Sequence, residues 1–286
     1  MTTPDTQPAA ASDTDDRSGS PAGTGGKLRL GGMALRNGLL VHGPTQWAAA
    51  VRSDGGEIEV ASGRKPRFRA ADPVPGVRGV ARLAEAFVVI PLVKRALPAA
   101  RLPFQDPSVL AVAAGASLGG TLLRRRVRGA GGEAAAGLVG FIPALFALRG
   151  GELAAYHGVE HKAIGAYEAD DADAADATKE HERCGSHLVA PMLASNLAGT
   201  LLLRRAVERP GPLAGGAVAL ASSAVAVEVF AWCERHSETR VARVLKRPGF
   251  EIQRLVGTRE PDERQLEVGR AALAEILRAE AASEIC

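Results

Sequence analysis

Four segments with almost no charged residues constrain this chain more than any other feature. They cover residues 107–123, 134–148, 188–203 and 210–230. A helix needs about 20 apolar residues to cross a bilayer, so the first three segments are short for a full span. We therefore expect a mainly α-helical membrane bundle of about four short spans in contact with a lipid bilayer. The alternative is a soluble helical protein in which these segments form the core.

Small residues recur within these segments at a spacing that matters for helix packing. Gly115 and Gly119, like Gly211 and Gly215, lie four residues apart. This spacing lets the backbones of membrane helices approach closely. The same pairs would permit a homo-oligomer.

The rest of the sequence predicts smaller units around the spans. We divide the chain into a disordered tail (1–26), a small β region (27–70), an interfacial helix region (71–106), a first membrane helix pair (107–150), a helix and loop with a metal site (151–187), a second membrane helix pair (188–233) and a C-terminal helical segment (234–286). The tail is rich in Asp, Thr, Ser, Pro and Gly, a composition typical of disorder.

The β region and the segment after it carry local signals. Asp54-Gly55 between two short strand-like runs predicts a hairpin. Gly31 and Gly32 could let the backbone approach a ligand, but a bulge or turn is the simpler interpretation. Residues 77–97 are charged at first and apolar later, with a kink expected at Pro91. We expect an amphipathic helix at the membrane interface; an ordinary core helix is the alternative.

Two helices are predicted in the C-terminal segment. The first is expected to end at Arg-Pro-Gly-Phe, residues 247–250. The second covers residues 261–282, where Leu266, Leu273 and Leu277 form one apolar stripe. We expect this stripe to pack against the cytoplasmic side of the bundle.

The charge-poor segments flank a stretch with most of the histidines. Within it, His157-Gly158-Val159-Glu160-His161 reads H-x-x-E-H. On a helix, His157 and His161 lie one turn apart and point the same way, so that together they could hold one divalent ion. Glu160 is placed where it could accept a proton from a metal-bound water, as in the inverted form of the zinc-protease helix motif.

Further candidate ligands follow this motif. His181 and Cys184 are three residues apart, and imidazole together with thiolate suits zinc. We predict a zinc site formed by His157, His161, His181 and Cys184, with Glu160 as the catalytic base. The alternative is a solvated helix rich in Glu, His and Lys.

Charge and cysteine content restrict partners and compartment. The net charge of +3 gives no reason to expect a nucleic-acid partner. Three widely spaced cysteines imply no disulfide framework. Basic residues flank both ends of the predicted spans in similar numbers, so the positive-inside rule does not decide the orientation. We expect a multi-pass protein of the cell membrane with cytoplasmic termini, because Cys184 as a ligand must stay reduced.

Glu228 lies inside the last apolar segment. A carboxylate within a membrane span suggests a function, here as a distant metal ligand or as the partner of a histidine. The alternative is a residue near the interface whose side chain reaches water.

Three groups of residues resemble a known family. The first is Tyr156 to Lys162 with Tyr167-Glu168, the second is His181-Glu182-Arg183-Cys184-Gly185-Ser186, and the third is Pro248 to Gln253 with 259–262 and 265–268. The chain is similar to the YqhQ-like bacterial membrane proteins, a family of unknown function labelled "predicted metal-dependent enzyme". The resemblance extends from about Gly31 to the C-terminal helix, and it implies a metal site without naming a reaction.

Two positions depart from the pattern of that family. Its N-terminal motif begins Gly-Gly-Gln and carries a Glu further on, where this chain has Met33 and Asn37. A Pro follows the histidine of its second motif, where this chain has Glu182. The resemblance therefore implies no substrate role for the N-terminal motif here.

Three hypotheses follow. The first is a membrane-embedded zinc-dependent hydrolase that acts on a peptide or a lipid-linked substrate. The second is a non-catalytic membrane protein in which four protein ligands close a structural metal site. In the third, no metal binds, and the His and Cys side chains only pack and form hydrogen bonds.

Overall fold

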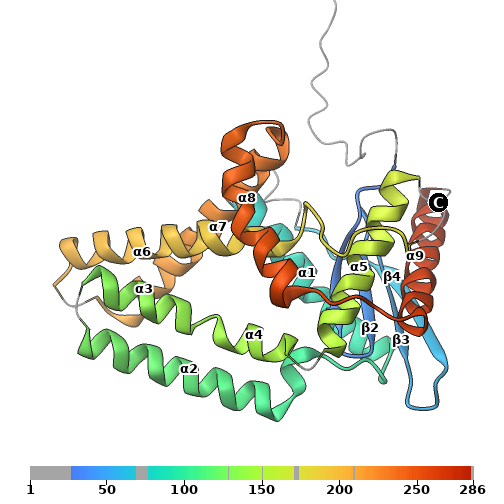
Figure 1. Ribbon diagram of the computed structural model, residues 1–286, viewed down its shortest axis with the longest axis horizontal. Coiled ribbons are helices and arrows are strands. Elements are labelled where there is room, and N and C mark those ends of the chain that lie inside the picture. Colours follow the sequence, from blue (N-terminus) through green and yellow to red (C-terminus); the bar gives the residue numbers. More distant parts are fainter. Residues whose placement is uncertain are drawn as a thin grey trace, which may run out of the picture.

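The computed structural model describes residues 27–68, 77–127, 129–149, 151–170, 174–208 and 210–284. The disordered tail predicted for residues 1–26 lies outside these ranges. Figure 1 shows an elongated molecule with a sheet and its helices at one end and further helices that extend from it. We call the first part the α/β unit (the sheet and helices within residues 31–64, 77–96, 152–169 and 263–284) and the second the helical lobe (the helices within residues 107–148 and 189–235).

A four-stranded antiparallel sheet confirms the predicted β region. It comprises β1 (Gly31–Leu35), β2 (Gly38–His42), β3 (Gln46–Arg52) and β4 (Ile58–Arg64), which pair in chain order. The predicted hairpin joins β3 to β4. Gly31 and Gly32 pair in regular register with His42 and Val41, so they form neither the bulge nor the turn that we preferred.

Helices cover both faces of this sheet, because side chains alternate along β2 and β3. One face packs against α5 (Glu152–Ala169) and α9 (Glu263–Glu284) through Leu39, Val41, Ala48 and Ala50. The other face packs against α1 (Val77–Ala96) through Leu35, Leu40, Trp47, Ala49 and Val51. The predicted stripe of α9 thus lies on the sheet, which corrects our placement of this helix on the membrane bundle.

Helix α1 combines features of both interpretations of its sequence. Val89 and Val93 are buried against the sheet, as the core-helix alternative requires. Phe87, Val88 and Leu92 are exposed, and α1 also contacts α7. A place at the membrane interface stays a prediction for this exposed side.

The helical lobe contains the predicted membrane segments. Its helices are α2 (Pro107–Arg126), α3 (Ala130–Val139), α4 (Ile142–Leu148), α6 (Val189–Ala206) and α7 (Pro212–Arg235). Within the described part of the chain, three stretches are long and apolar enough to cross a membrane: Ala130–Leu148, Gly185–Ala206 and Leu213–Arg235. The fourth predicted span, in α2, is not among them; this helix ends in three arginines.

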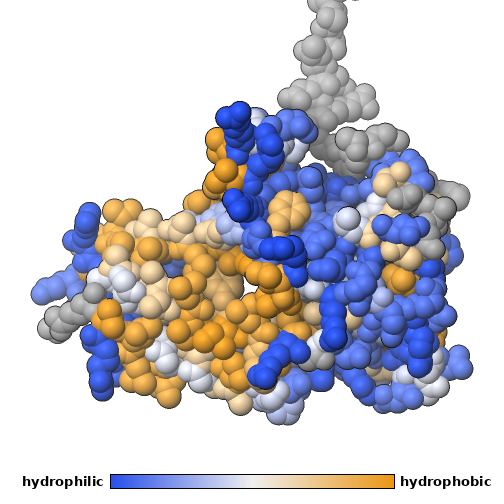
Figure 2. Space-filling model, in the orientation of Figure 1, coloured by the Kyte–Doolittle hydropathy of each residue, from blue (hydrophilic) through white to orange (hydrophobic). Residues whose placement is uncertain are grey.

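Hydrophobic side chains cover the surface of this lobe, whereas the α/β unit is mostly hydrophilic (Figure 2). Large apolar residues are exposed on every helix of the lobe, among them Leu118, Leu138, Ile142, Leu202 and Leu220. So large an apolar surface is unusual for a soluble monomer. The three candidate spans and this surface are consistent with a membrane protein.

Helix α8 differs from its sequence-based prediction. It covers Arg240–Ile252 and contains Pro248, where we expected the chain to leave the helix. The helical path then continues as one π-helical turn, Gln253–Gly257. The expected end at residues 247–250 is therefore wrong.

Candidate metal centre

Helix α5 brings His157 and His161 to a cavity between the α/β unit and the helical lobe. The two rings lie one turn apart on the same helix face, with their centroids separated by 4.4 Å. The cavity has a volume of about 430 Å³ and is bounded by β1, α5, the end of α4 and the segment around Cys184. Cys184 is buried and caps a short 3-10 turn, Gly185–Leu188.

The ligand atoms of His157, His161 and Cys184 all lie within 4.8 Å of one another. Nδ1 of His157 lies 2.7 Å from the carbonyl oxygen of Gly257, and Nδ1 of His161 lies 2.6 Å from that of Lys179. Because a carbonyl only accepts, both Nδ1 atoms must donate. In the neutral ring each Nε2 then carries a lone pair, and this is the form in which imidazole binds metals.

One of these atoms has no partner at all among the described residues. Nε2 of His161 is fully buried without a hydrogen bond, whereas Nε2 of His157 lies 3.4 Å from Sγ of Cys184. A buried polar atom without a partner is costly unless something else satisfies it. The donor set of two imidazole nitrogens and one thiolate fits a zinc ion.

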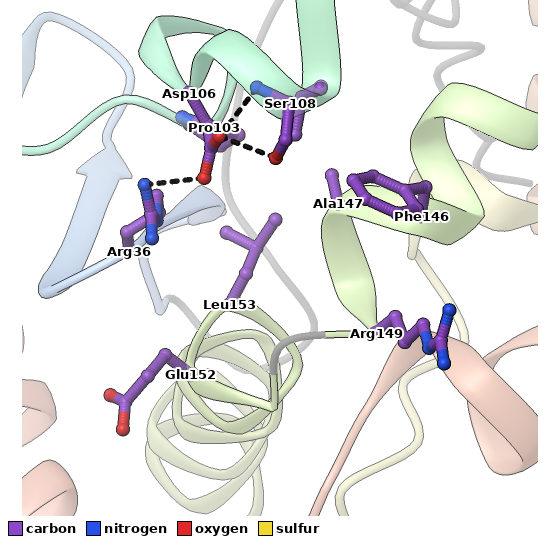
Figure 3. Close-up of a pocket in the computed structure, with 10 residues that line it drawn as sticks. Arg36, Pro103, Asp106, Ser108, Phe146, Ala147, Arg149, Glu152 and Leu153 are labelled. Carbon is purple, nitrogen blue, oxygen red and sulfur yellow. Dashed lines mark hydrogen bonds and ion pairs between the residues drawn. The ribbon is translucent and has the colours of Figure 1, made fainter. Parts of the chain in front are cut away.

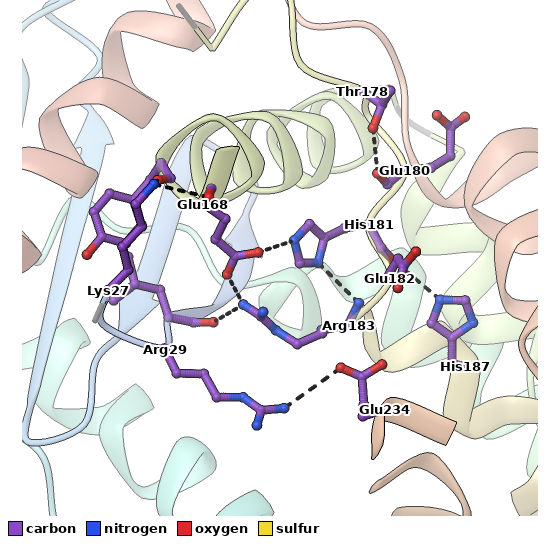
Figure 4. Close-up of polar contacts among 12 residues, drawn as sticks. Lys27, Arg29, Glu168, Thr178, Glu180, His181, Glu182, Arg183, His187 and Glu234 are labelled. Atoms are coloured by element: carbon purple, nitrogen blue, oxygen red, sulfur yellow. Dashed lines mark hydrogen bonds and ion pairs between the residues drawn. The ribbon is translucent and has the colours of Figure 1, made fainter. Parts of the chain in front are cut away.

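His181, the fourth predicted ligand, is not part of this group. Its Nε2 lies 3.3 Å from Oε2 of Glu168, and its Nδ1 accepts a hydrogen bond from the backbone N–H of Arg183 at 3.2 Å (Figure 4). The guanidinium of Arg183 also pairs with Glu168. Burial would raise the pKa of Glu168, but the hydrogen bonds from His181 and Arg183 hold this pKa below its usual value. Both ring nitrogens of His181 are thus engaged elsewhere.

Glu160 borders the same cavity but lies outside the group of ligand atoms. Its side chain packs against the backbone of Gly32 in β1. A Cβ atom at Gly32 would come within 2.6 Å of Cγ and 2.7 Å of Cδ of Glu160. Gly32 therefore permits a close approach, to the side chain of Glu160 rather than to a ligand.

The remaining residues singled out in the sequence lie around or away from this cavity. Met33 lines it, whereas Asn37 donates from its amide nitrogen to the carbonyl groups of Arg52 and Ala99. Glu182 forms an ion pair with Lys246. Glu228 lines a different cavity, between α7 and α8.

A second cavity, of about 390 Å³, adjoins the cavity beside His157 and His161, since Pro103 and Leu153 border both. Its walls come from both halves of the molecule (Figure 3). Arg36 and Asp106 form an ion pair of 2.9 Å on one side, and Phe146 of α4 lies on another. The adjoining cavity therefore links the surroundings of the ligand group to the helical lobe.

The sequence analysis gave no role to Gln253, which holds the loop before Cys184. Its side chain is completely buried and accepts a hydrogen bond from the backbone N–H of His181 at 2.8 Å. Its amide nitrogen donates to the carbonyl of His181 at 3.2 Å and to the hydroxyl of Ser186 at 2.9 Å. The π-helical turn that begins here also supplies the Gly257 carbonyl to His157. The only signal in the sequence was that Gln253 is a polar residue within the third group of the family resemblance.

If zinc occupies the group of His157, His161 and Cys184, Gln253→Ala should weaken its binding by roughly 10–100-fold, the usual effect of losing a group that orients metal ligands. The loop that carries Cys184 would lose its hydrogen bonds to the π-helical turn. Arg254→Ala is the matched control, because this neighbouring side chain points outward and pairs only with Glu251 among the described ion pairs. Competition with a chromogenic chelator measures both affinities. Equal affinities in the two variants would show that Gln253 does not position the ligands.

A family model matches part of the chain. Residues 151–279 match the model of a family described as "Protein of unknown function (DUF1385)". No curated protein and no solved structure matches the chain. The matched segment extends from the residue before α5 into α9, so it contains His157, Glu160, His161, Cys184 and Gln253. The match supports an uncharacterised family and implies no reaction.

Proposed function

We propose that this protein is a membrane metalloenzyme that binds zinc through His157, His161 and Cys184. The observation that carries the proposal is the buried Nε2 of His161, which has no partner among the described residues and lies beside two further ligand atoms. The Nδ1 contacts to backbone carbonyls support it, because they fix the tautomer that metal binding requires. The label "predicted metal-dependent enzyme" of the YqhQ-like family, which the chain resembles, agrees with this proposal.

A catalytic site is favoured over a structural one by the number of protein ligands. Structural zinc sites are closed by four protein ligands, whereas catalytic sites have three and keep one position open. The group here has three members among the described residues, and the fourth candidate, His181, contacts Glu168 and Arg183 instead. A cavity of about 430 Å³ beside the ligands leaves room for a substrate.

Hydrolysis is the reaction class that these residues support best. Zinc, when bound, would lower the pKa of a coordinated water toward about 7. Glu160 borders the cavity without being one of the ligands, a place that suits a general base. Its packing against Gly32 fixes where the carboxylate lies. The adjoining cavity on the side of the helical lobe would accommodate a peptide or a lipid-linked substrate.

Elemental analysis of detergent-purified protein tests the metal site. We expect about one zinc per chain in the parent protein and none in His157→Ala/His161→Ala, because two of three ligands are lost. His181→Ala is the matched control and should retain zinc. Absence of metal from the parent protein, together with equal stability of the double variant, would contradict the proposal. Loss of zinc from His181→Ala would indicate a fourth ligand and a closed, structural site.

A further inference from the structure

Helix α8 exposes an apolar stripe, one member of which, Leu245, also borders the cavity between α7 and α8. Val241, Val244 and Leu245 have exposed fractions of 58%, 68% and 37%, and Pro248 continues the stripe. These positions are three, four and seven residues apart, the spacing of one helix face. A second face of the helix is buried and includes Ala242, Lys246 and Gly249. An exposed apolar stripe on a helix that is anchored to the fold by its other residues indicates a missing partner.

Three arginines flank this stripe. Arg240, Arg243 and Arg247 are all exposed, and no carboxylate of a described residue pairs with them. The helix contains no acidic residue before Glu251 near its end. An apolar face bordered by arginines without acidic partners is typical of helices that lie in the interface of an anionic membrane.

The place of α8 in the fold agrees with an anionic membrane as the partner of this stripe. It follows α7, whose candidate span ends at Arg235, after a linker of only four residues. Figure 1 shows α8 crossing the direction of α6 and α7, where the helical lobe meets the α/β unit. In Figure 2 a hydrophobic strip on this projection faces the side of the apolar lobe, and hydrophilic residues cover its other side. A bilayer around the lobe would therefore end at the apolar side of α8.

We propose that α8 docks on the anionic headgroup layer of the membrane that surrounds the helical lobe. Val241, Val244 and Leu245 enter the boundary between headgroups and acyl chains, to a depth of about 5–10 Å. Arg240, Arg243 and Arg247 contact lipid phosphates, and each changes the ratio of docked to undocked helix by a factor of roughly five. This inference does not depend on the proposed zinc site.

Docking would connect the lipid surface to the loop that carries Cys184. The carbonyl of Gly249 accepts a hydrogen bond from the hydroxyl of Ser186 at 3.1 Å, and the carbonyl of Lys246 lies 2.9 Å from Nδ1 of His187. A Cβ atom at Gly249 would lie 2.2 Å from Nδ1 of His187, so the contact is close. The buried face of α8 thus holds this loop, while the outer face of the same helix meets the lipid.

Tryptophan quenching in liposomes of the full chain tests the proposal. The variant Val244→Trp is reconstituted with anionic phospholipid, part of it brominated near the headgroup end of the acyl chains. The parent protein already contains Trp47 and Trp232, so its fluorescence is subtracted from that of the variant. We expect strong quenching of the remaining signal, which comes from the indole introduced on α8. Glu57→Trp, at an exposed turn of the α/β unit, is the matched control and should not be quenched. Quenching of Trp232 in the candidate span reports insertion of the chain.

Charge is tested in the same assay. Adding Arg240→Gln, Arg243→Gln and Arg247→Gln to Val244→Trp should shift the docking ratio on the order of a hundredfold and abolish most of the quenching. Liposomes of neutral phospholipid should have the same effect on the arginine-containing protein. Quenching of Trp232 without quenching of the indole on α8 would overturn the proposal and leave the stripe for a protein partner. If the indole on α8 were still quenched both in the arginine-to-glutamine variant and in neutral liposomes, the role of anionic lipid would be overturned. All four substituted positions are exposed, so we expect these variants to fold like the parent protein. Their unfolding temperatures, compared with that of the parent protein, check this.

Discussion

Glu160→Gln is expected to retain zinc and to lose roughly 10²–10⁴-fold in the rate of hydrolysis, the usual contribution of a general base. The substitution keeps the size of the side chain but removes its ability to accept a proton at neutral pH. Zinc should stay bound, because Glu160 is not among the three clustered ligand residues. The assay is hydrolysis of p-nitrophenyl acetate, an activated ester small enough for the cavity, beside elemental analysis of the same samples.

The position of the Glu160 carboxylate can be tested by a substitution in β1, at Gly32. In Gly32→Ala the new methyl group would lie 2.6 Å from Cγ of Glu160, so the carboxylate must move. We expect lower hydrolytic activity with zinc retained. Gly31→Ala is the matched control, since a Cβ atom there meets nothing within 4 Å. If Glu160→Gln and Gly32→Ala both matched the parent rate while retaining zinc, the hydrolytic role of Glu160 would be untenable.

Helical periodicity alone was enough to predict that His157 and His161 share a face, because residues four apart on a helix always do. The structure brings these two rings together with Cys184, which lies 23 residues beyond His161. Spacing could not predict the environment of His181. Its ring turns to Glu168 and Arg183, and such competition among polar partners depends on a tertiary arrangement that local sequence does not encode.

The fold shows the same division between local and tertiary information. The Asp-Gly turn and the helical stripe of α9 are local signals, and both elements formed where expected. A stripe indicates only that one helix face is buried, so it could not tell that α9 packs on the sheet instead of the bundle. Pro248 was assigned to a helix end by propensity. It lies inside α8, one residue before Gly249, whose backbone packs closely on His187. Such a tertiary contact is not encoded in local propensity.

The ends of α2 and α6 and the start of α3 lie at the end of the helical lobe farthest from the sheet (Figure 1). A buried acid at this end is held by two arginines. Glu133, in the first turn of α3, has a side chain that is only 4% exposed. Arg124 at the end of α2 binds one of its oxygens at 3.0 Å, and Arg204 at the end of α6 lies 2.5 Å from the other. The three residues connect the ends of three helices, so we expect them to affect the stability of the lobe.

Arg124→Met/Arg204→Met is expected to reduce the free energy of unfolding by about 3 kcal/mol. Breaking a buried ion pair from one side costs roughly 3–5 kcal/mol, because the remaining charge stays buried without compensation. The lower figure applies here, since the N-terminus of α3 also stabilises a carboxylate in its first turn. Chemical denaturation in detergent micelles measures the change. Arg125→Met/Arg205→Met is the matched control, as both of these arginines are exposed and outside the described ion pairs.

A triple variant separates the stranded charge from lost packing. Adding Glu133→Met to Arg124→Met/Arg204→Met removes the last charge, and apolar replacement of a complete buried ion cluster is often neutral or stabilising. We therefore expect the triple variant to recover most of the lost free energy. Equal instability of the double and triple variants would show that the aliphatic stems of the arginines, and not their charges, stabilise the helix ends. The ion cluster would then have no part in holding α2, α3 and α6 together.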